Sequence, residues 1–307
     1  MSGLPMTDSA VTALEARFEG RLRRHEPMAR HTSWHVGGPA DLFFEPRDRA
    51  DLAVFLQSVP ATLPITWVGL GSNLLVRDGG LRGAVVVTHG ALSGLERRDD
   101  GLIWCEAGVP CARIARQCVR WGLGPAEFFA GIPGTLGGAL AMNAGAFGGE
   151  TWRHVVSVEV MGRDGRIYDR SAGEYRVSYR HIDPPVAGEA FLAATLRFEA
   201  RPASSNETIR DLLVERKTKQ PIGEWSCGSV FINPPGDHAA RLIEAAGLKG
   251  TRRGGATVSP KHANFIVNEG AATAAELESL IAEVQQIVQR QFGVRLQTEV
   301  RIVGEAA

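Results

Sequence analysis

The chain has 307 residues, of which 44% are hydrophobic and 22% charged, and its 34 basic side chains balance its 34 acidic ones. These values are typical of a globular protein of about two domains, and the balance excludes a general attraction to nucleic acid or anionic lipid. No run approaches the ~20 apolar residues of a membrane span, and the polar N-terminal segment lacks the apolar core of a signal peptide. We therefore expect a cytoplasmic protein without membrane insertion or nucleic-acid binding.

Strands are predicted where short apolar or alternating runs are bounded by turn residues. These runs lie at 65–68, 84–88, 102–106, 155–161, 191–198, 264–267 and 298–303. Helices are predicted from their end signals. The signals are Pro110 and Gly122, Ser204 with Glu207, and Thr273 with Glu276 ahead of Gly293. Because strands and helices do not alternate strictly, the pattern favours an α+β fold over a doubly wound sheet.

Two segments are rich in glycine, one at 68–76, which directly follows a predicted strand, and one at 131–145. Such density permits positive φ and close backbone approach, so successive N–H groups can converge on a phosphate. Side chains that can add donors are those of Ser72, Asn73, Thr135 and Asn143. Neither segment matches G-x-G-x-x-G, because Leu occupies position 74, and no P-loop motif is present. Spacing alone leaves two interpretations open, a pyrophosphate cradle and tight turns in a glycine-rich fold.

Other candidate residues carry little information from spacing alone. Ser229 follows a glycine and precedes an apolar run, so its ordinary interpretation is a serine in a turn. Glu299 lies on a predicted strand, so its ordinary interpretation is a carboxylate that faces solvent. Arg216 and Lys219 lie on a predicted helix and suit either a diphosphate clamp or a solvated face. The four cysteines include no C-x-x-C pair, so we expect reduced, packed thiols. We expect no metal site, because Gly37-Gly38 argues against a helix that would align the two preceding histidines.

The motifs taken together resemble those of the UDP-N-acetylenolpyruvoylglucosamine reductase family, over about residues 30–303. In the family's order they are His31-Thr-Ser, Gly37-Gly-Pro-Ala-Asp41, Gly69-Leu-Gly-Ser-Asn-Leu-Leu-Val76, Glu127 with Gly131-Ile-Pro-Gly-Thr-Leu-Gly-Gly138 and Met142-Asn-Ala-Gly-Ala-Phe-Gly148, Tyr179-Arg-His181, Lys219-Gln-Pro221, Cys227-Gly-Ser-Val-Phe-Ile-Asn-Pro234, Ala246-Gly-Leu-Lys-Gly250, Ser259-Pro-Lys-His-Ala-Asn-Phe-Ile-Val-Asn268 and Glu299.

The resemblance implies a two-part FAD-binding region of the vanillyl-alcohol-oxidase type, followed by a smaller α+β substrate-binding domain. The expected division is a helical lead-in at 1–29, FAD-binding subdomains at 30–90 and 91–201, and a substrate domain at 202–307, with a boundary at 201–206. The FAD is expected to be non-covalent, because the first glycine segment lacks a tethering His. The residues implied to hold it are Gly69, Gly71, Ser72, Asn73, Leu74, Gly131, Ile132, Pro133, Gly134, Thr135, Gly137, Gly138, Asn143 and Gly145.

The implied reaction has two halves, in which NADPH reduces the flavin and the flavin then reduces an enolpyruvyl ether on UDP-N-acetylglucosamine, for cell-wall synthesis. Ser229 resembles the proton donor, Arg180 the cation that faces the substrate carboxylate, and Glu299 a carboxyl group at the same centre. A positioned hydroxyl and a planar guanidinium suit those tasks. Residues that resemble positions near the UDP-sugar or nicotinamide are Tyr179, Arg216, Lys219, Asn233, Lys261 and Asn264.

Two departures from the family pattern matter. Ile182 follows His181 where the family often has Ser, and no tyrosine occurs after Tyr179, which implies the branch without a clamping tyrosine. Two alternatives stay open, another FAD oxidoreductase of this fold acting on a different sugar or alcohol, and a catalytically silent flavin-binding protein. The set of Ser229, Arg180 and Glu299 argues against both. We expect a monomer.

Overall fold

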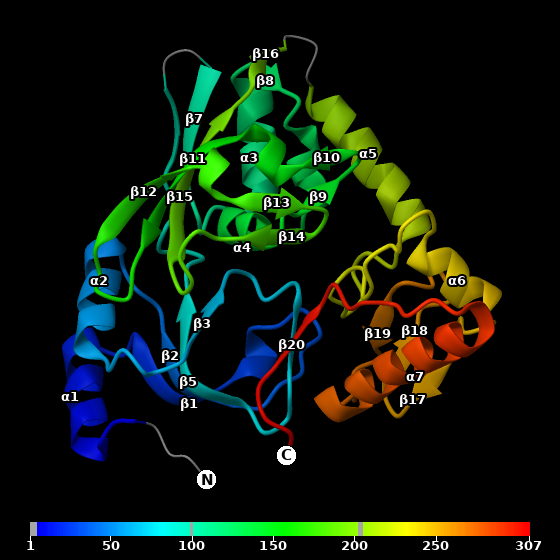
Figure 1. Cartoon of the computed structure of the whole chain (residues 1–307), viewed down its shortest axis with the longest axis horizontal. Coiled ribbons are helices and arrows are strands. Elements are labelled where there is room, and N and C mark those ends of the chain that lie inside the picture. Colours follow the sequence, from blue (N-terminus) through cyan, green and yellow to red (C-terminus); the bar gives the residue numbers. More distant parts are fainter. Residues whose placement is uncertain (1–4, 99–100, 202–204) are drawn as a thin grey trace. The chain divides into compact units, whose positions relative to one another are not determined.

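The computed structural model describes residues 5–98, 101–201 and 205–307 (Figure 1). The helices of these ranges are α1 Asp8–Phe18, α2 Arg49–Ser58, α3 Cys111–Arg120, α4 Leu136–Ala141, α5 Asn206–Lys219, α6 Ala239–Ala245 and α7 Ala274–Phe292. The strands are β1 Leu22–Pro27, β2 Pro39–Phe44, β3 Ile65–Val68, β4 Leu74–Val76, β5 Leu81–Val87, β6 Leu95–Arg97, β7 Leu102–Glu106, β8 Leu123–Gly124, β9 Gly145–Ala146, β10 Gly149–Glu150, β11 Val155–Met161, β12 Ile167–Ser171, β13 Arg176–Ser178, β14 His181–Asp183, β15 Ala190–Arg197, β16 Glu199–Ala200, β17 Arg252–Arg253, β18 Ala256–Val258, β19 Ile266–Asn268 and β20 Arg301–Val303.

The chain forms two compact units, each built from separate stretches of sequence. The first comprises residues up to 24, 42–70 and 83–213, and the second comprises 25–41, 71–82 and 214–307. The first glycine segment therefore contributes Gly69 to the first unit and 71–74 to the second. The four-segment division expected from the sequence stays a prediction, and residues 202–204 of its expected boundary lie outside the described ranges.

A five-stranded antiparallel sheet organises one part of the first unit, with the order β12-β11-β15-β7-β6. Its strands alternate as the sequence predicts: on β7, Ile103 and Cys105 are fully buried, whereas Trp104 between them is only partly covered. Helices α3 and α4 bury their apolar side chains in the same core as these strands. Sheet and helices together thus position the second glycine segment, which runs through α4.

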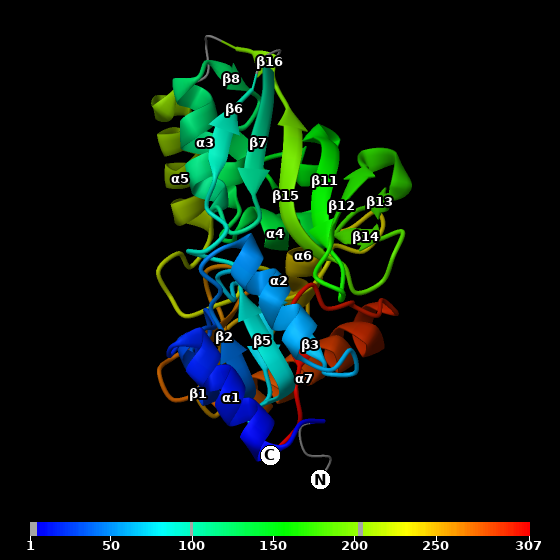
Figure 2. The same ribbon diagram turned by 90° about the vertical axis from the view of Figure 1, so that its left-hand side faces the viewer.

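A second core of the first unit lies between helices α1 and α2 and a four-stranded sheet of order β1-β2-β5-β3. Both helices cover one face of this sheet in Figure 2. Phe44 of β2 lies 4.7 Å from Phe18 of α1 and 4.3 Å from Phe55 of α2, measured between ring centroids. Strand β3, which leads directly into the first glycine segment, pairs in parallel with β5.

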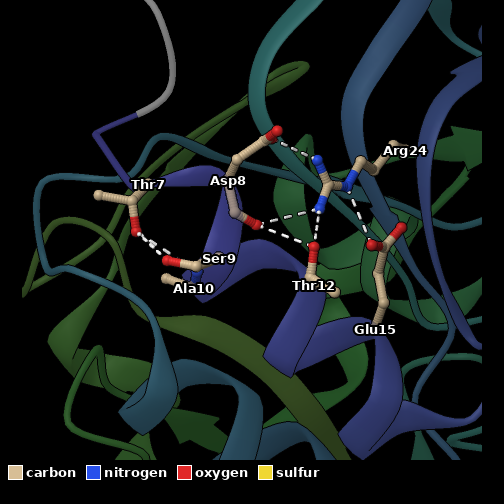
Figure 3. Close-up of polar contacts among 7 residues, drawn as sticks. All are labelled: Thr7, Asp8, Ser9, Ala10, Thr12, Glu15 and Arg24. Carbon is tan, nitrogen blue, oxygen red and sulfur yellow. Dashed lines mark hydrogen bonds and ion pairs between the residues drawn. The ribbon is translucent and has the colours of Figure 1, made fainter.

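Polar contacts fasten the N-terminal helix to strand β1 (Figure 3). Thr7 caps α1, and Arg24 of β1 reaches back to Asp8 at 2.6 Å and to Glu15 at 2.9 Å. The bond to Asp8 is the largest of the contacts that raise the pKa of Arg24. The pair with Asp8 is exposed, and ion pairs of this kind contribute little to the free energy of unfolding.

The second unit packs α6 and α7 with the antiparallel sheet β17-β18-β19. Helix α7 is bounded as predicted, by a capping box of Thr273 and Glu276 and by Gly293 at φ 71°. Trp34 is fully buried in this core and donates its indole N–H to the carbonyl of Ile266 at 2.8 Å. The parallel pair β4–β20 joins the end of the first glycine segment to the C-terminal residues.

Several predicted boundaries need correction. The strand at 84–88 begins at Leu81, the strand at 264–267 is shifted to Ile266–Asn268, and the strand at 298–303 is confined to Arg301–Val303. Glu299 therefore precedes β20 instead of lying on a strand, because its backbone groups bond to two different segments. Helix α5 is confirmed, and its first turn is capped by the hydroxyl of Ser205, which accepts from the N–H of Thr208 at 3.1 Å. Ser204, the predicted cap, lies outside the described residues.

All four cysteines are free and buried, as predicted. Burial raises the pKa of Cys118 and of Cys227 to about 12, so both thiols stay protonated at neutral pH. Across the described ranges, no helix is long and apolar enough to cross a bilayer. The same residues contain no group of three or more His, Cys, Asp or Glu that could hold a metal ion.

Candidate active site

The two glycine segments meet within the first unit. A Cβ atom placed on Gly69 would lie 2.3 Å from Oγ1 of Thr135, which is closer than any side chain allows. Glycine is therefore required at position 69 for the first segment to approach the second. The presence of glycine at position 69 is thus explained by the close approach of two loops, both of which are predicted to bind the cofactor.

Gly71 is required for a different reason. Its φ is 61°, and a Cβ would lie 1.9 Å from the carbonyl oxygen of His31. The Gly71 carbonyl in turn accepts the N–H of Ser33 at 3.2 Å. The His31-Thr-Ser motif thus packs against the first glycine segment and forms a hydrogen bond with it. Ser72 and Leu74 are half-buried beside it, and the Leu74 carbonyl accepts the thiol of Cys227 at 3.4 Å.

Thr135 is the residue of the second segment that best fits a bound phosphate. It lies at the N-cap of α4, only 1% exposed, and its hydroxyl has no hydrogen-bond partner among the described residues. An unpaired buried hydroxyl costs about 1–3 kcal/mol, so such a group is expected to have a ligand. A Cβ on the neighbouring Gly138 would meet only that hydroxyl, at 4.0 Å, which leaves the backbone there open to approach.

Other amides of this segment are already used by the protein. The N–H of Leu136 donates to Val109 at 2.9 Å, and that of Gly137 donates to Ala107 at 2.7 Å. The carbonyl of Gly134 accepts the N–H of Cys111 at 2.9 Å. The expectation that successive N–H groups converge on a phosphate therefore does not extend to positions 136 and 137. Ile132 is buried and Pro133 is exposed.

Two further glycines are explained by protein packing alone. A Cβ on Gly131 would lie 2.6 Å from Cβ of Ala146, and one on Gly145 would lie 2.2 Å from the carbonyl oxygen of Gly149. The hairpin β9–β10 occupies the space that side chains would need. Glycine at these two positions therefore reflects a tight fold, which is one of the two interpretations left open by the sequence. The pyrophosphate cradle stays a prediction.

Arg180 lies in the two-residue turn between β13 and β14, with φ at 58°. Its Nη2 donates to the carbonyl of Gly145 at 3.0 Å, and Nη1 to that of Asn143 at 3.4 Å. The guanidinium also lies 5.2 Å from the ring centroid of Tyr179, which is 47% exposed. The second glycine segment thus holds the predicted carboxylate-binding cation in place.

Ser229 and Glu299 lie on adjoining backbone segments of the second unit. The N–H of Glu299 donates to the carbonyl of Val230, the residue after Ser229, at 2.8 Å. The carbonyl of Glu299 accepts the side-chain amide of Asn73 at 3.0 Å. Gly228, at φ 73°, gives the turn that precedes Ser229. The family resemblance implied that the two predicted catalytic residues share one centre, but no local pattern marks this proximity, because 70 positions separate them in the sequence.

Two asparagines predicted to lie near the substrate have structural partners. Asn264 is buried, accepts the N–H of Phe231 at 2.9 Å and donates to its carbonyl at 2.8 Å. It thereby fixes the backbone two residues beyond Ser229. Asn233 accepts the N–H of Ala239 at 3.1 Å, at the start of α6. Both side chains support the Ser229 segment, a role that the sequence did not indicate.

The predicted cations of α5 lie near its C-terminal end. Lys219 pairs with Glu215 at 2.6 Å on the exposed surface, and Arg216 donates to the Gln220 side chain at 2.6 Å. Lys261 donates to the carbonyl of Lys217 at 2.5 Å. Through the Lys217 carbonyl, Lys261 thus contacts the last turn of the helix that carries Arg216 and Lys219. The exposed ion pair of Lys219 is weak, so an anion can compete with Glu215 for it.

Comparison with known proteins identifies the two regions separately. Residues 40–171 match the family model of an FAD binding domain. Residues 220–303 match the model described as the UDP-N-acetylenolpyruvoylglucosamine reductase C-terminal domain. The prediction of an α+β chain with an FAD-binding region followed by a smaller C-terminal domain is thereby confirmed, and the vanillyl-alcohol-oxidase type of that region stays a prediction.

Similar proteins cover almost the whole chain. The UDP-N-acetylenolpyruvoylglucosamine reductase of Alkalilimnicola ehrlichii is 57% identical over 96% of this chain and 99% of its own length. That of Methylococcus capsulatus is 54% identical over 97% of both. The crystal structure of the reductase from Thermus caldophilus superposes with a TM-score of 0.74 at 32% identity, covering 92% of this chain and 98% of its own. The chain therefore belongs to the UDP-N-acetylenolpyruvoylglucosamine reductase family.

Proposed function

We propose that this protein uses NADPH and FAD to reduce UDP-N-acetylglucosamine enolpyruvate to UDP-N-acetylmuramate. The product is a precursor of peptidoglycan, so the enzyme would act in the cytoplasm and contribute to cell-wall synthesis, cell shape and division. The observation that carries the proposal is the near full-length relationship to reductases of this name, in a chain that places Ser229 and Glu299 on adjoining segments.

Non-covalent FAD fits the residues of the two glycine segments. The orphaned hydroxyl of Thr135 supplies a donor for a phosphate oxygen, and Gly138 leaves room for close approach. Gly69 and Gly71 permit the first segment to adopt its path, with Ser72 as a further donor. The residues of these segments would hold FAD, which would supply the hydride-transfer chemistry between NADPH and the enolpyruvyl substrate.

Ser229 is proposed to protonate the carbon that gains negative charge when the hydride arrives. A hydroxyl is a weak acid, but the charge on that carbon makes it a strong base, so a positioned O–H suffices. Glu299 is proposed to assist at the same centre, and its fixed backbone keeps it beside the Ser229 segment. Cys227, two residues away, is no rival as proton donor, because the residue is buried and its thiol donates to the Leu74 carbonyl at 3.4 Å.

Arg180 is proposed to bind the substrate carboxylate as charge develops beside it. Its guanidinium is planar and permanently charged, which suits a carboxylate, and its contacts with two backbone carbonyls fix it before the substrate arrives. Arg216, Lys219 and Lys261 are proposed to meet the diphosphate or nicotinamide. No tyrosine occurs in 205–307, so the substrate would be bound without a clamping tyrosine from that region.

One assay tests the proposed function directly. Purified protein should be yellow and should release intact FAD on acid precipitation. In a separate assay of the native protein, NADPH oxidation should require UDP-N-acetylglucosamine enolpyruvate. One UDP-N-acetylmuramate should form for each NADPH oxidised. Flavin that stays with the polypeptide would contradict non-covalent binding, and substrate-independent NADPH oxidation would instead favour another flavin oxidoreductase.

A further inference from the structure

The side chain of Asn143 is completely engaged by the protein around it. The residue is 1% exposed. Its Nδ2 donates to the carbonyl of Ser178 at 3.0 Å and to Oε2 of Glu150 at 3.2 Å, while its Oδ1 accepts the N–H of Trp152 at 3.1 Å. Asparagine carries two amide hydrogens, and both have partners here.

These contacts fix the orientation of the amide. Rotating it by half a turn would place Oδ1 against a carbonyl and a carboxylate, and would place Nδ2 against an N–H group. All three neighbours therefore require the same arrangement. With both hydrogens used, the Asn143 side chain has no donor left for a flavin phosphate, although it lies in the segment predicted to bind FAD.

The contact with Ser178 connects Asn143 to the turn that carries Arg180. Ser178 ends β13, and Tyr179 and Arg180 form the turn before β14. In return, Arg180 donates to the carbonyls of Asn143 and Gly145. Three hydrogen bonds thus link residues 143–145 to residues 178–180, and they run in both directions.

These hydrogen bonds offset two unfavourable free-energy terms that arise when Arg180 is held in its observed conformation. A non-glycine residue at φ 58° is in a sparsely populated conformation that costs about 1–3 kcal/mol. Ordering a free arginine side chain costs roughly 2 kcal/mol more in conformational entropy. Anchoring Ser178 holds the turn, and the two carbonyls hold the guanidinium, so both costs are met before the substrate binds.

We propose that Asn143 is a positioning residue for Arg180, acting through the Ser178 carbonyl, and is not a ligand of the cofactor. Its catalytic consequence rests on the proposed role of Arg180 in binding the substrate carboxylate. The link itself, between the second glycine segment and the Arg180 turn, is independent of that role.

Asn143→Asp tests the proposal, because it keeps the size and backbone preference of the residue but replaces the donor with oxygen. That oxygen would face the Ser178 carbonyl and the Glu150 carboxylate. We expect FAD to bind the apoprotein with an unchanged Kd and NADPH to reduce the bound flavin at the wild-type rate. Reoxidation by the enolpyruvyl sugar should slow by about 10–100-fold, the usual consequence of misplacing a group by about 1 Å.

Asn143→Gly is the matched second variant. Glycine adopts positive φ readily, so this change deletes the side chain without straining the backbone, which has φ 45° here. It should slow reoxidation as Asn143→Asp does. The double variant Asn143→Asp, Arg180→Ala should be no slower than Arg180→Ala alone, because a residue that acts only through Arg180 has nothing left to position.

A readout without substrate separates this proposal from the proposed function. Trypsin cleaves after Arg180 only when the turn opens, so cleavage at the Arg180–His181 bond, followed by mass spectrometry, should be about 10-fold faster in Asn143→Asp than in wild type. Unchanged cleavage, a weakened FAD Kd with normal reoxidation, or independent effects in the double variant would each overturn the proposal. Failure of the wild-type enzyme to use the enolpyruvyl sugar would overturn the proposed function, and the cleavage result would still decide the link.

Discussion

The side-chain amide of Asn73 donates a 3.0 Å hydrogen bond to the backbone carbonyl of Glu299. Two positions further on, the N–H of Arg301 donates to the carbonyl of Asn73 at 3.0 Å, and strands β4 and β20 continue this pairing in parallel. The first glycine segment is thus the neighbour against which the segment of Glu299 is aligned. A loop predicted to bind FAD therefore also sets the position of a predicted catalytic carboxyl group.

We predict that Asn73→Asp weakens catalysis through Glu299. The substitution preserves shape but places an oxygen against the Glu299 carbonyl, so the loss of a bond worth about 1 kcal/mol is joined by repulsion. Reoxidation by the enolpyruvyl sugar should slow by about 10-fold, a moderate displacement effect. Stopped-flow absorbance of the flavin, with NADPH and with the sugar in separate experiments, measures each half. A normal rate of reoxidation would show that Glu299 is held adequately by Val230 alone.

Thr135→Val should change FAD affinity and stability in opposite directions. Valine has the same shape without the hydroxyl, so the apoprotein loses an unpaired buried group and should be up to about 1–3 kcal/mol more stable. If the hydroxyl donates to a phosphate, FAD should bind about 10–100-fold more weakly. Flavin fluorescence titration and urea unfolding of the apoprotein measure the two effects.

Thr151→Val is the control for this experiment. The Thr151 hydroxyl is also fully buried, but it donates to the Ala144 carbonyl at 2.7 Å. Its removal leaves that carbonyl with one bond fewer and should destabilise the apoprotein by about 1 kcal/mol. If both valine variants destabilise the apoprotein equally, Thr135 has a partner in the protein and the phosphate interpretation fails.

The sequence predicts the elements better than the partners of their side chains. Helix α7 and strands β3, β7 and β11 lie where end signals and alternation placed them, because those signals act within a few residues. The clamping of Glu299 between Val230 and Asn73, and the use of the Asn143 amide by Glu150 and Ser178, depend on segments brought together only by folding. No local pattern marks them.

Glycine shows the same limit. The density of glycine in 131–145 predicts close backbone approach correctly, but the sequence does not say what approaches. For Gly131 and Gly145 it is the β9–β10 hairpin, whereas for Gly69 it is the neighbouring glycine segment. Packing and cofactor binding require the same residue type, so only the folded structure separates them.

Stability should fall at alkaline pH because of the buried thiols. The folded-state pKa of Cys118 and of Cys227 is about 12, above the ~8.5 of a free thiol. The contribution of these two thiols to the free energy of unfolding is therefore complete below pH ~8.5. It declines as the pH rises toward 12, by up to about 1.4 kcal/mol per pH unit for each thiol. The stability difference between wild type and Cys118→Ala, or Cys227→Ala, should shrink by about 2 kcal/mol from pH 7.5 to pH 10. Urea unfolding at the two pH values measures it, and a constant difference would mean that the thiols ionise in the fold.

Ser229→Ala provides the most direct test of the proposed mechanism. The hydroxyl is proposed to act only when the substrate carbon needs a proton, so the variant should keep FAD and be reduced by NADPH at close to the wild-type rate. Reoxidation by UDP-N-acetylglucosamine enolpyruvate should slow by about 10²–10⁴-fold, the usual contribution of a general acid. Ser229→Cys should recover part of that loss, because a thiol also donates a proton. Stopped-flow absorbance of the flavin in each half-reaction gives both rates. Equal slowing of the two halves, or no slowing of either, would contradict the assignment of Ser229 as the proton donor.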